Sequence, residues 1–175
     1  TGWSGGGQDN SSPYTGAYTF TAASTAPGSQ NVTATNGWAL TSSATAFTIV
    51  ADTTAPSVTA PSVTAGYYTS LSVPVSKNGG TDGGSGVDAT SSVLERDDAT
   101  LTNGACGSFS GSWSTVTLTG GNDTGVLSGH CYEYREKLSD NVGNQGTSSP
   151  SNVVKVDNQG PTNSISLSNV SPAGS

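Results

Sequence analysis

The sequence predicts an all-β fold with β-sandwich domains in tandem, for two reasons: its composition and an internal repeat. Of 175 residues, 24 are Gly, 8 are Pro, none is Met and 10% are charged, whereas about 25% of residues are charged in an ordinary soluble domain. Thr and Val fill the periodic stretches, because their branched Cβ atoms pack well on a pleated sheet. Gly, Asn, Asp and Ser separate these stretches and favour turns. This composition is typical of many short strands.

The internal repeat predicts the domain boundaries. Residues 49–56 read Ile-Val-Ala-Asp-Thr-Thr-Ala-Pro and residues 154–161 read Val-Lys-Val-Asp-Asn-Gln-Gly-Pro, each a short apolar strand followed by Asp and then Pro. The period is the 105 residues between Asp52 and Asp157, close to one sandwich domain of about 100 residues. Proline has no N–H and ends the strand pairing. The prediction is a C-terminal part of one domain in 1–52, a complete domain in 53–157 and the first strand or strands of another in 158–175.

Within the complete domain, apolar residues at alternate positions predict the strands in order. The expected strands cover 57–64, 70–77, 91–97 and 112–119, with a glycine-rich loop at 79–86 and a turn at Asn103-Gly104. Asn-Gly pairs tolerate the positive φ of tight hairpins. Trp113 is expected to anchor the core from the strand over 112–119.

The strand expected over 131–138 is the most informative, because side chains alternate between the two faces of a strand. The aromatic face is expected to point into the core and the charged face to the solvent. The first set is Tyr132, Tyr134, Glu136 and Leu138, and the second is Cys131, Glu133, Arg135 and Lys137. Glu136 therefore has an inward position that the pattern alone does not explain.

The C-terminal half of this domain carries a family resemblance. The residues that carry it are Tyr132-x-Tyr134, then Asp140-Asn141-Val142-Gly143-Asn144, then Val153–Asp157 and Pro161. This pattern resembles the last two strands of bacterial immunoglobulin-like and fibronectin-type-III-like repeats of large secreted surface proteins, and it is similar to long tandem arrays of the actinobacterial type. The resemblance implies an immunoglobulin-like sandwich of seven strands, export, and a role in adhesion or in stalks and fibres. It supplies no catalytic residues.

The two cysteines, Cys106 and Cys131, predict a disulfide in an oxidising compartment; two free thiols are the alternative. Closing a loop of 25 residues would add about 3.5 kcal/mol in the chain-entropy model. The chain opens Thr-Gly-Trp without a recognisable leader segment, so we expect either a mature chain or a fragment. We expect it to be secreted or at the cell surface.

The net charge of −7, with five basic residues, argues against nucleic acid and against anionic membrane surfaces as partners, because phosphate contacts need cations. No apolar run approaches the roughly 20 residues that span a bilayer. The single histidine, His130, has no Gly-x-Ser-x-Gly nucleophile motif to serve, so we expect a surface residue and no enzyme. Carboxylates could act as an acid–base pair or hold Ca²⁺, and the candidates are Glu95, Asp97 and Asp98, with Asp82 and Asp88 in the glycine-rich loop. Because no Asp-x-Asp-x-Asp-Gly loop is present, we expect a solvated rim in which Arg96 pairs locally.

Calcium at the domain junctions is the one cofactor that the sequence suggests. Oxygen-bearing side chains are expected near one end of the sandwich beside the linker, and Ca²⁺ prefers 6–8 oxygen ligands. These residues are Asp52, Asp140, Asn141, Asn144 and Asp157. The alternative is that Asp140 and Asn144 only cap a turn.

Two other sets of residues are candidates for surface chemistry. Asn-x-Ser/Thr sequons, which accept N-linked glycans in secreted proteins, begin at Asn10, Asn31, Asn122 and Asn169. Exposed aromatic residues in 1–52 would stack on sugars, and the candidates are Trp3 and Trp38, with Tyr14 and Tyr18 nearby.

The function expected first is structural: a repeat of an extracellular filament, stalk or adhesin, assembled head-to-tail with neighbouring copies or repeats. In its sharpest form, strands in 158–175 of one copy open a domain that the strands in 1–52 of the next copy close; the alternative is that both belong to consecutive domains of one continuous chain. The first alternative is a glycan- or protein-binding adhesion module that contacts a host surface. The second is an accessory repeat of a secreted hydrolase.

Overall fold

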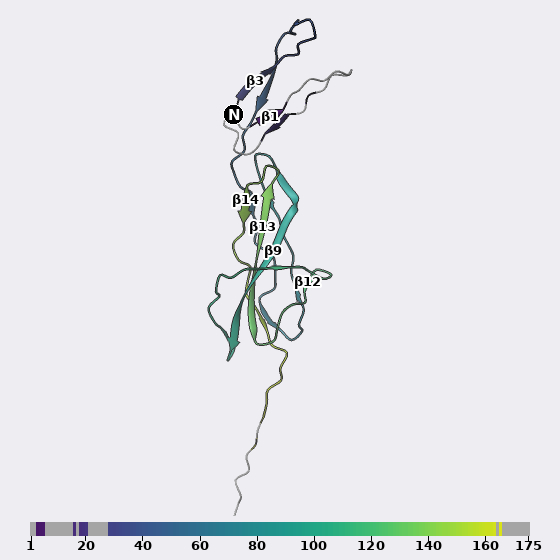
Figure 1. Ribbon diagram of the computed structural model, residues 1–175. Helices are drawn as coiled ribbons and strands as arrows, with labels where there is room; N and C mark the ends of the chain where they lie inside the picture. The colour runs from purple at the N-terminus through teal and green to yellow at the C-terminus, as the bar shows by residue number, and fades with distance from the viewer. Residues whose placement is uncertain (1–2, 6–15, 17, 21–27, 164, 166–175) are drawn as a thin grey trace, which may run out of the picture.

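A computed structural model describes residues 3–5, 16, 18–20, 28–163 and 165 of the chain. In these residues the protein is all-β, as the composition predicts, and no helix occurs (Figure 1). A central body, residues 53–157, has a separate group of strands beyond one end, and residues 158–163 lead away from the other end (Figure 1). Within the described part of the chain, no helix has the length and apolar character needed to cross a bilayer.

Two antiparallel pairs make up the N-terminal group. β1 (Trp3–Gly5) pairs with β2 (Tyr18–Phe20), and β3 (Gly28–Val32) pairs with β4 (Thr45–Ile49). The chain then passes from β4 through Asp52 into the central body.

The largest sheet of the central body has seven strands. Its main path runs through β10 (Ala105–Cys106), β9 (Val87–Thr102), β13 (His130–Asp140), β15 (Val154–Val156) and β6 (Gly66–Tyr68), with β11 (Ser114–Val116) paired to β9 and β14 (Gln145–Thr147) paired to β13. All these pairs are antiparallel except β15 with β6. The β9–β13 ladder runs from Thr100 opposite His130 to Val87 opposite Asp140. These two strands therefore extend along the whole body. Asp140, the last residue of β13, lies at the end of the body where the chain enters from β4 (Figure 1).

Two short strand pairs complete the body. β5 (Ser57–Val58) pairs with β8 (Gly80–Thr81), and β7 (Val73–Pro74) pairs with β12 (Asn122–Asp123). The first two predicted strands, 57–64 and 70–77, are much shorter in the structure, and both contain a proline, Pro61 and Pro74, that donates no ladder hydrogen bond. The strand predicted over 91–97 is instead longer, because β13 pairs with it far beyond those bounds.

The core lies between the inner face of the large sheet and the segments around β7 and β12. Its buried members are Val63, Val73, Val75, Leu94, Val126, Tyr132, Tyr134, Val154 and Val156. An ion pair crosses this core: Arg96 Nη1 lies 2.7 Å from Asp123 Oδ2, which also accepts a hydrogen bond of 3.1 Å from the hydroxyl of Tyr134. Because Asp123 belongs to β12 and the other two residues to β9 and β13, these bonds join the two groups of strands.

The predicted inward face of the last long strand is confirmed, since its four side chains are at most 2% exposed. Glu136 is accommodated because donors surround it. Its Oε2 accepts hydrogen bonds from the backbone N–H groups of Asn78 and Gly79 at 3.1 and 3.0 Å, and its Oε1 accepts one of 2.6 Å from the hydroxyl of Ser92. A buried carboxylate is tolerated when its oxygens are hydrogen-bonded in this way.

The expectation of a solvated rim is confirmed for Asp98, whose side chain is 56% exposed, and is wrong for Glu95 and Asp97, which lie on the opposite, partly covered face of the sheet. Glu95 and Asp97 are 8% and 1% exposed, because the segment after β10 crosses them: Asp97 accepts hydrogen bonds from the hydroxyl of Ser110 and the N–H of Gly111. Arg96 pairs with Asp123 in the core and not with these neighbours. Trp113 is also not a core anchor, since its ring lies on this outer face, 4.3 Å from the Arg135 guanidinium carbon.

Candidate cation site at the N-terminal end of the central body

Three carboxylates that are far apart in the sequence meet where the chain enters the central body. Asp52 belongs to the linker after β4, Asp82 to the glycine-rich loop after β8, and Asp140 is the last residue of β13. One oxygen of each lies within 4.8 Å of the others. We refer to Asp52, Asp82 and Asp140 as the carboxylate cluster.

The linker and the glycine-rich loop hold two members of the cluster through backbone hydrogen bonds. Asp52 Oδ1 accepts from the N–H of Thr54 at 3.0 Å, and its Oδ2 accepts from the N–H of Ser85 at 2.6 Å. Asp82 Oδ2 accepts from the N–H groups of Gly84 and Gly86 at 3.0 and 2.8 Å. A Cβ atom at Gly84 would collide with the Asp52 carboxylate, so a side chain at this position would displace that carboxylate.

Asp140 is held by the turn that it begins, residues 140–144, which we call the Asp140 turn. Its Oδ1 accepts hydrogen bonds from the N–H groups of Val142 and Asn144 at 3.0 and 2.8 Å, and its Oδ2 accepts one of 2.6 Å from Asn144 Nδ2. The same Asn144 amide donates to the carbonyl of Asp52 at 3.1 Å. The predicted turn cap is therefore present, and it also joins the turn to the linker.

Two buried oxygen atoms beside the cluster have no hydrogen-bond partner, namely Asp82 Oδ1 and Ser85 Oγ. A buried polar atom without a partner costs about 1–3 kcal/mol, and a bound cation would satisfy both. Both oxygens belong to the glycine-rich loop, whose Ser85 N–H also donates a hydrogen bond to Asp52. They are therefore further oxygen ligands that a cation at the cluster could use.

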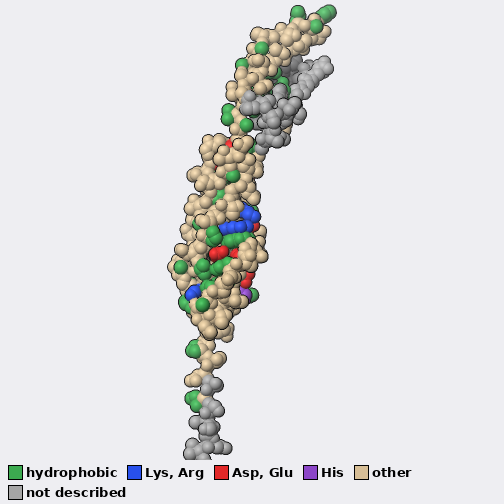
Figure 2. Space-filling model, turned by 90° about the vertical axis from the view of Figure 1, so that its left-hand side faces the viewer, with side chains coloured by type: hydrophobic (Ala, Val, Ile, Leu, Met, Phe, Trp, Pro, Cys, Tyr) green, Lys and Arg blue, Asp and Glu red, His purple; other side chains and the backbone are tan. Residues whose placement is uncertain are grey.

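No basic side chain neutralises the cluster. The chain has five Lys and Arg residues, and each has partners elsewhere: Arg96 with Asp123, Arg135 and Lys137 with Glu95, Lys77 with the Ser92 carbonyl and Lys155 with the Gly104 carbonyl. On the face shown in Figure 2, Lys, Arg, Asp and Glu side chains gather over the middle of the central body, and the surface toward both ends is mainly uncharged.

The local hydrogen bonds favour the ionised forms of Asp52 and Asp140 by lowering the pKa of each. The N–H of Ser85, followed by that of Thr54, lowers the pKa of Asp52 below its ordinary value. Burial acts to raise the pKa of Asp140, but the hydrogen bonds from Asn144, Val142 and Gly143 outweigh it and the pKa is lowered. Hydrogen bonds to the charged form favour that form. Asp52 and Asp140 therefore favour their charged forms, and no basic side chain lies beside them.

This donor set fits a hard divalent cation. Ca²⁺ takes 6–8 oxygen ligands from carboxylates, carbonyls and waters in flexible geometry. Three carboxylates and the hydroxyl of Ser85 are all oxygen donors of this class, whereas zinc sites in proteins use mainly sulfur and nitrogen. The residues that would hold the cation are Asp52, Asp82 and Asp140, with Ser85 as a further donor.

Four of the five predicted calcium ligands gather here. Asn141 lies beside the cluster, and its Nδ2 donates to the Ser85 carbonyl at 2.8 Å. Asp157 does not belong to the group, because it lies at the opposite end of the body, where its N–H bonds the Tyr68 carbonyl. The error has a simple origin: Asp52 and Asp157 hold equivalent positions in the two similar sequence segments 49–56 and 154–161, and these segments lie at opposite ends of the central body (Figure 1). The sequence analysis considered Asp82 as a Ca²⁺ ligand but left it out of the junction site, because it lies among glycines without a ligand motif around it.

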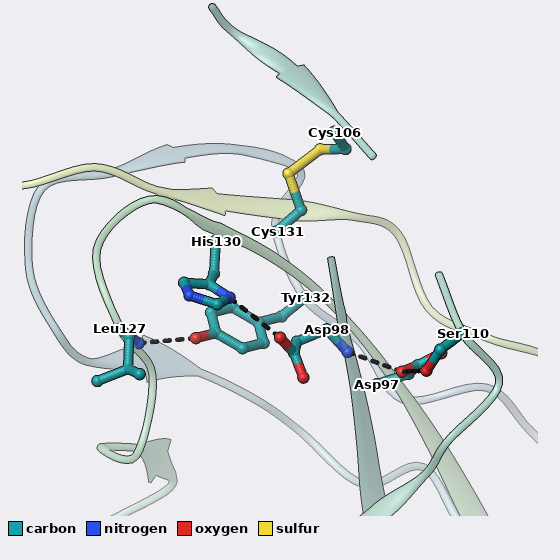
Figure 3. Close-up of polar contacts among 8 residues, drawn as sticks. All are labelled: Asp97, Asp98, Cys106, Ser110, Leu127, His130, Cys131 and Tyr132. Atoms are coloured by element: carbon teal, nitrogen blue, oxygen red, sulfur yellow. Dashed lines mark hydrogen bonds and ion pairs between the residues drawn. A yellow bond between two sulfur atoms is a disulfide. The ribbon is translucent and has the colours of Figure 1, made fainter. Parts of the chain in front are cut away.

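The surroundings of His130 do not form a nucleophile–base pair (Figure 3). Its Nδ1 lies 3.0 Å from Asp98 Oδ2 and its ring stacks on Tyr132, with 5.9 Å between centroids. The nearby hydroxyl of Ser110 donates to Asp97 instead. Behind these residues, Cys131 forms the predicted disulfide with Cys106, and its side chain is fully buried.

The remaining predicted surface residues are placed as follows. Asn31 is exposed, and Asn122 is half-buried with its Nδ2 donating to the Gly120 carbonyl. Trp38 is 88% exposed. Asn10, Asn169, Tyr14 and the side chain of Trp3 lie outside the described residues. Compared with protein-family models, curated protein sequences and solved structures, the chain has no match.

Proposed function

We propose that this chain is a structural segment of an extracellular filament, stalk or adhesin, built of immunoglobulin-like β-sandwich units in head-to-tail order. The disulfide suits an oxidising compartment. In this proposal residues 53–157 are one unit, 1–52 contribute the last strands of the unit before it, and 158–175 begin the unit after it.

The observation that carries the proposal is that the chain enters and leaves the central body at opposite ends (Figure 1). Units joined in this way line up along one axis and do not fold back on one another. The two linkers also share a local structure: Asp52 Oδ1 accepts a hydrogen bond from the N–H of Thr54, and Asp157 Oδ1 accepts one from the N–H of Gln159, both at 3.0 Å. A repeated linker geometry supports a repeated, extended arrangement.

The carboxylate cluster gives this arrangement a means of stiffening. Its members come from the linker, from a loop and from the end of β13, so a Ca²⁺ ion held by all three would fix the linker to the body. Without the ion, the like charges of Asp52, Asp82 and Asp140 repel one another. The proposal therefore includes a calcium-dependent stiffness of the junction.

Calcium titration of the full chain tests this part of the proposal. Isothermal titration calorimetry is expected to show one saturable Ca²⁺ site, and small-angle X-ray scattering is expected to show a narrower distribution of maximum dimensions with Ca²⁺ than with EGTA. Asp82→Asn should weaken Ca²⁺ binding at least about tenfold, because it removes a charged oxygen ligand. Heat and scattering that do not change with Ca²⁺ would contradict calcium stiffening.

A matched control comes from the same loop region. Asp88 is half-buried and accepts hydrogen bonds from Thr90, outside the cluster. Asp88→Asn removes one negative charge, as Asp82→Asn does, and should leave Ca²⁺ affinity within about twofold of the original. Equal losses in the two variants would show a general charge effect and no specific site.

A second candidate function, binding of a glycan through stacking on an aromatic ring, is favoured by one observation. Trp38 is 88% exposed at the tip of the β3–β4 hairpin, and Leu40 beside it is 69% exposed. Binding to a panel of surface glycans that Trp38→Ser abolishes would support this function over a purely structural one.

A further inference from the structure

The β3–β4 hairpin closes with a turn over residues 36–40, which we call the Asn36 turn. Asn36 Oδ1 accepts hydrogen bonds from the N–H groups of Trp38 and Leu40, both at 3.0 Å. The N–H of Asn36 donates to the Leu40 carbonyl, and the N–H of Ala39 donates to the Asn36 carbonyl, each at 3.0 Å. Ala39 has a φ of 60°. The turn is thus locked by its own bonds while it exposes its tip.

The Asp140 turn has the same hydrogen-bond pattern at each step. Asp140 Oδ1 accepts from the third and fifth residues of the turn. The N–H of Asp140 donates to the Asn144 carbonyl at 3.0 Å, and the N–H of Gly143 donates to the Asp140 carbonyl at 3.2 Å. Gly143 has a φ of 96°. The two turns are therefore structural equivalents in successive units.

The equivalence extends to the place where each turn contacts its linker. The Asp140 turn rests on the linker at Asp52, through Asn144 and the carboxylate cluster. Asp157 begins the equivalent linker at the other end of the body, with the same bond to the second residue after it. If each turn rests on the linker that precedes its own unit, the linker at Asp157 would receive the Asn36 turn of a second copy.

A pocket of about 580 Å³ opens beside this second linker. Its walls include Tyr67, Leu101, Asp157 and Gln159. Tyr67 is 58% exposed, with the Lys155 ammonium 5.2 Å from its ring centroid. Pockets that bind small ligands have volumes of about 300–1,000 Å³, so there is room here for one large side chain. The lining is mostly polar, but Tyr67 and Leu101 give it an apolar part against which an aromatic ring could pack.

The side chains of the two turns differ, and those of the Asn36 turn are the larger and more apolar ones. Trp38 stands where the other turn has Val142, and Leu40 stands where it has Asn144. Asn36 stands where it has Asp140, so the charged group of the carboxylate cluster is missing. In Figure 2, hydrophobic side chains stand at the far tip of the N-terminal group. The Asn36 turn is therefore suited to an apolar contact and not to a cation site.

We infer that the Asn36 turn of a second copy of this chain docks on the C-terminal end of the central body, with Trp38 in the pocket beside Asp157. This inference rests on the head-to-tail order of the proposed function and names the surface that would make it. Burial of one Trp removes about 150–250 Å² from water. The contact is heterologous, because different surfaces of the two copies meet, and such contacts generate open chains.

Self-association of the full chain in solution tests the inference. In a dilution series followed by ¹H–¹⁵N NMR, the amide signals of the Asn36 turn and of Tyr67, Leu101 and Gly129 should shift together as the concentration rises. Sedimentation velocity should show a concentration-dependent increase in mass. Trp38→Ser and Tyr67→Ser should each weaken self-association at least about tenfold, since a few buried aromatic residues carry most of the affinity of an interface.

Val50→Ser is the matched control. Val50 is 81% exposed, comparable to Trp38, and lies just after the other end of the same hairpin. This variant should associate as the original chain does. Thermal unfolding of all three variants checks that each remains folded, and the large exposure of Trp38 and Tyr67 predicts little change.

A mixture of the two defective variants gives the sharpest result. Trp38→Ser keeps an intact pocket and Tyr67→Ser keeps an intact Trp38, so the mixture should form one-to-one dimers although neither variant associates alone. Longer chains should be absent because each dimer has a defect at both free ends. No association of the original chain up to millimolar concentration, or no rescue in the mixture, would overturn the inference.

The outcomes also separate this inference from the calcium part of the proposed function. Association that survives EGTA and the Asp82→Asn substitution supports the apolar contact even if Ca²⁺ binding fails. Association lost in EGTA but unaffected by Trp38→Ser overturns it and assigns the contact to the carboxylate cluster. Retention of Trp38-dependent glycan binding without self-association overturns it as well.

Discussion

The Asn36 turn and the Asp140 turn have the same backbone geometry, but the first exposes apolar side chains and the second contributes a charged one. In each, one side-chain oxygen accepts two N–H groups and the fourth residue has a positive φ. One turn contributes a carboxylate to a charged cluster, and the other exposes a Trp and a Leu. The comparison shows that the turn geometry needs only an Asx acceptor and a residue tolerant of the left-handed region. The residues between these two positions are therefore able to change the contact that the turn makes.

The largest difference is expected when the disulfide is removed. Replacing Cys106 and Cys131 together by Ala should lower the free energy of unfolding of the central body by about 3.5 kcal/mol, the chain-entropy value for a loop of this length. Urea unfolding followed by far-ultraviolet circular dichroism measures this loss. Amide hydrogen exchange in the Asn36 turn should not change, because its hydrogen bonds run within residues 34–43. Faster exchange there would mean that the turn depends on the central body.

The next difference concerns charge, and it is tested by exchanging the first residues of the two turns. Asp140→Asn keeps a side-chain oxygen to accept the turn hydrogen bonds but removes a cation ligand, so the increase in melting temperature caused by Ca²⁺ should disappear. Asn36→Asp adds a carboxylate where no cluster is expected, and the Ca²⁺ stoichiometry measured by calorimetry should remain at one. A second site in Asn36→Asp, or an unchanged calcium response in Asp140→Asn, would show that the cluster is not the binding site.

A smaller difference is expected at the fourth residue of each turn. Gly143→Ala forces a Cβ into the positive-φ region, where nothing crowds it, and should cost about 1 kcal/mol from conformational strain alone. Ala39→Gly should relieve a similar strain in the Asn36 turn. Urea unfolding measures the first change, and slower amide exchange in residues 36–40 measures the second. The two substitutions should therefore act in opposite directions; effects of the same sign would contradict the equivalence of the turns.

The smallest expected difference is a local response to acid. The pKa values of Asp52 and Asp140 are lowered from 3.8, so the stability that their ionised forms provide is present above that pH and is lost as the pH falls through the lowered values. In an NMR titration, the amide signals of Val142 and Asn144 should move only below about pH 4, because the pKa of Asp140 lies below its ordinary value. The Asn36 turn has an amide acceptor that does not titrate, and its amide signals should stay in place. Parallel shifts in both turns would indicate global unfolding instead.

Alternation of side chains was enough to predict the inward face of β13. The tyrosines at positions 132 and 134 are buried as expected, and the disulfide is present. The same reasoning did not show why Glu136 is tolerated, because its donors come from residues 78 and 79 and from Ser92. These partners are distant in sequence, and periodicity describes only one strand at a time.

The burial of Glu95 and Asp97 on the outer face of the sheet was not predicted, for a related reason. Charged residues at alternate positions of β9 and β13 indicate solvent when each strand is considered alone. The segment from Cys106 to Trp113 crosses that face and covers Asp97, with Trp113 stacked on Arg135. No local pattern predicts where a loop will lie after it leaves its own strand.

The candidate site was predicted in part. Asp52, Asp140 and Asn144 could be grouped because linker and turn residues belong to the same end of a unit. Asp157 was added wrongly, because a repeat makes two residues equivalent without making them neighbours. Asp82 was left out of the junction site because its role depends on the path of the loop, which brings it within 4.8 Å of the other two carboxylates.

The sequence by itself determined the all-β class, the inward face of the last long strand, the cysteine pair and the turn-forming residues, because each depends on neighbouring residues or on composition. The tertiary structure decided which carboxylates meet, which charged side chains are buried and which turn is left exposed. These depend on contacts between segments far apart in the chain, such as the linker at Asp52, the loop at Asp82 and the end of β13. Turn geometry is local, and so it occurs both at residues 36–40 and at residues 140–144, whereas the surface against which each turn lies is set by packing.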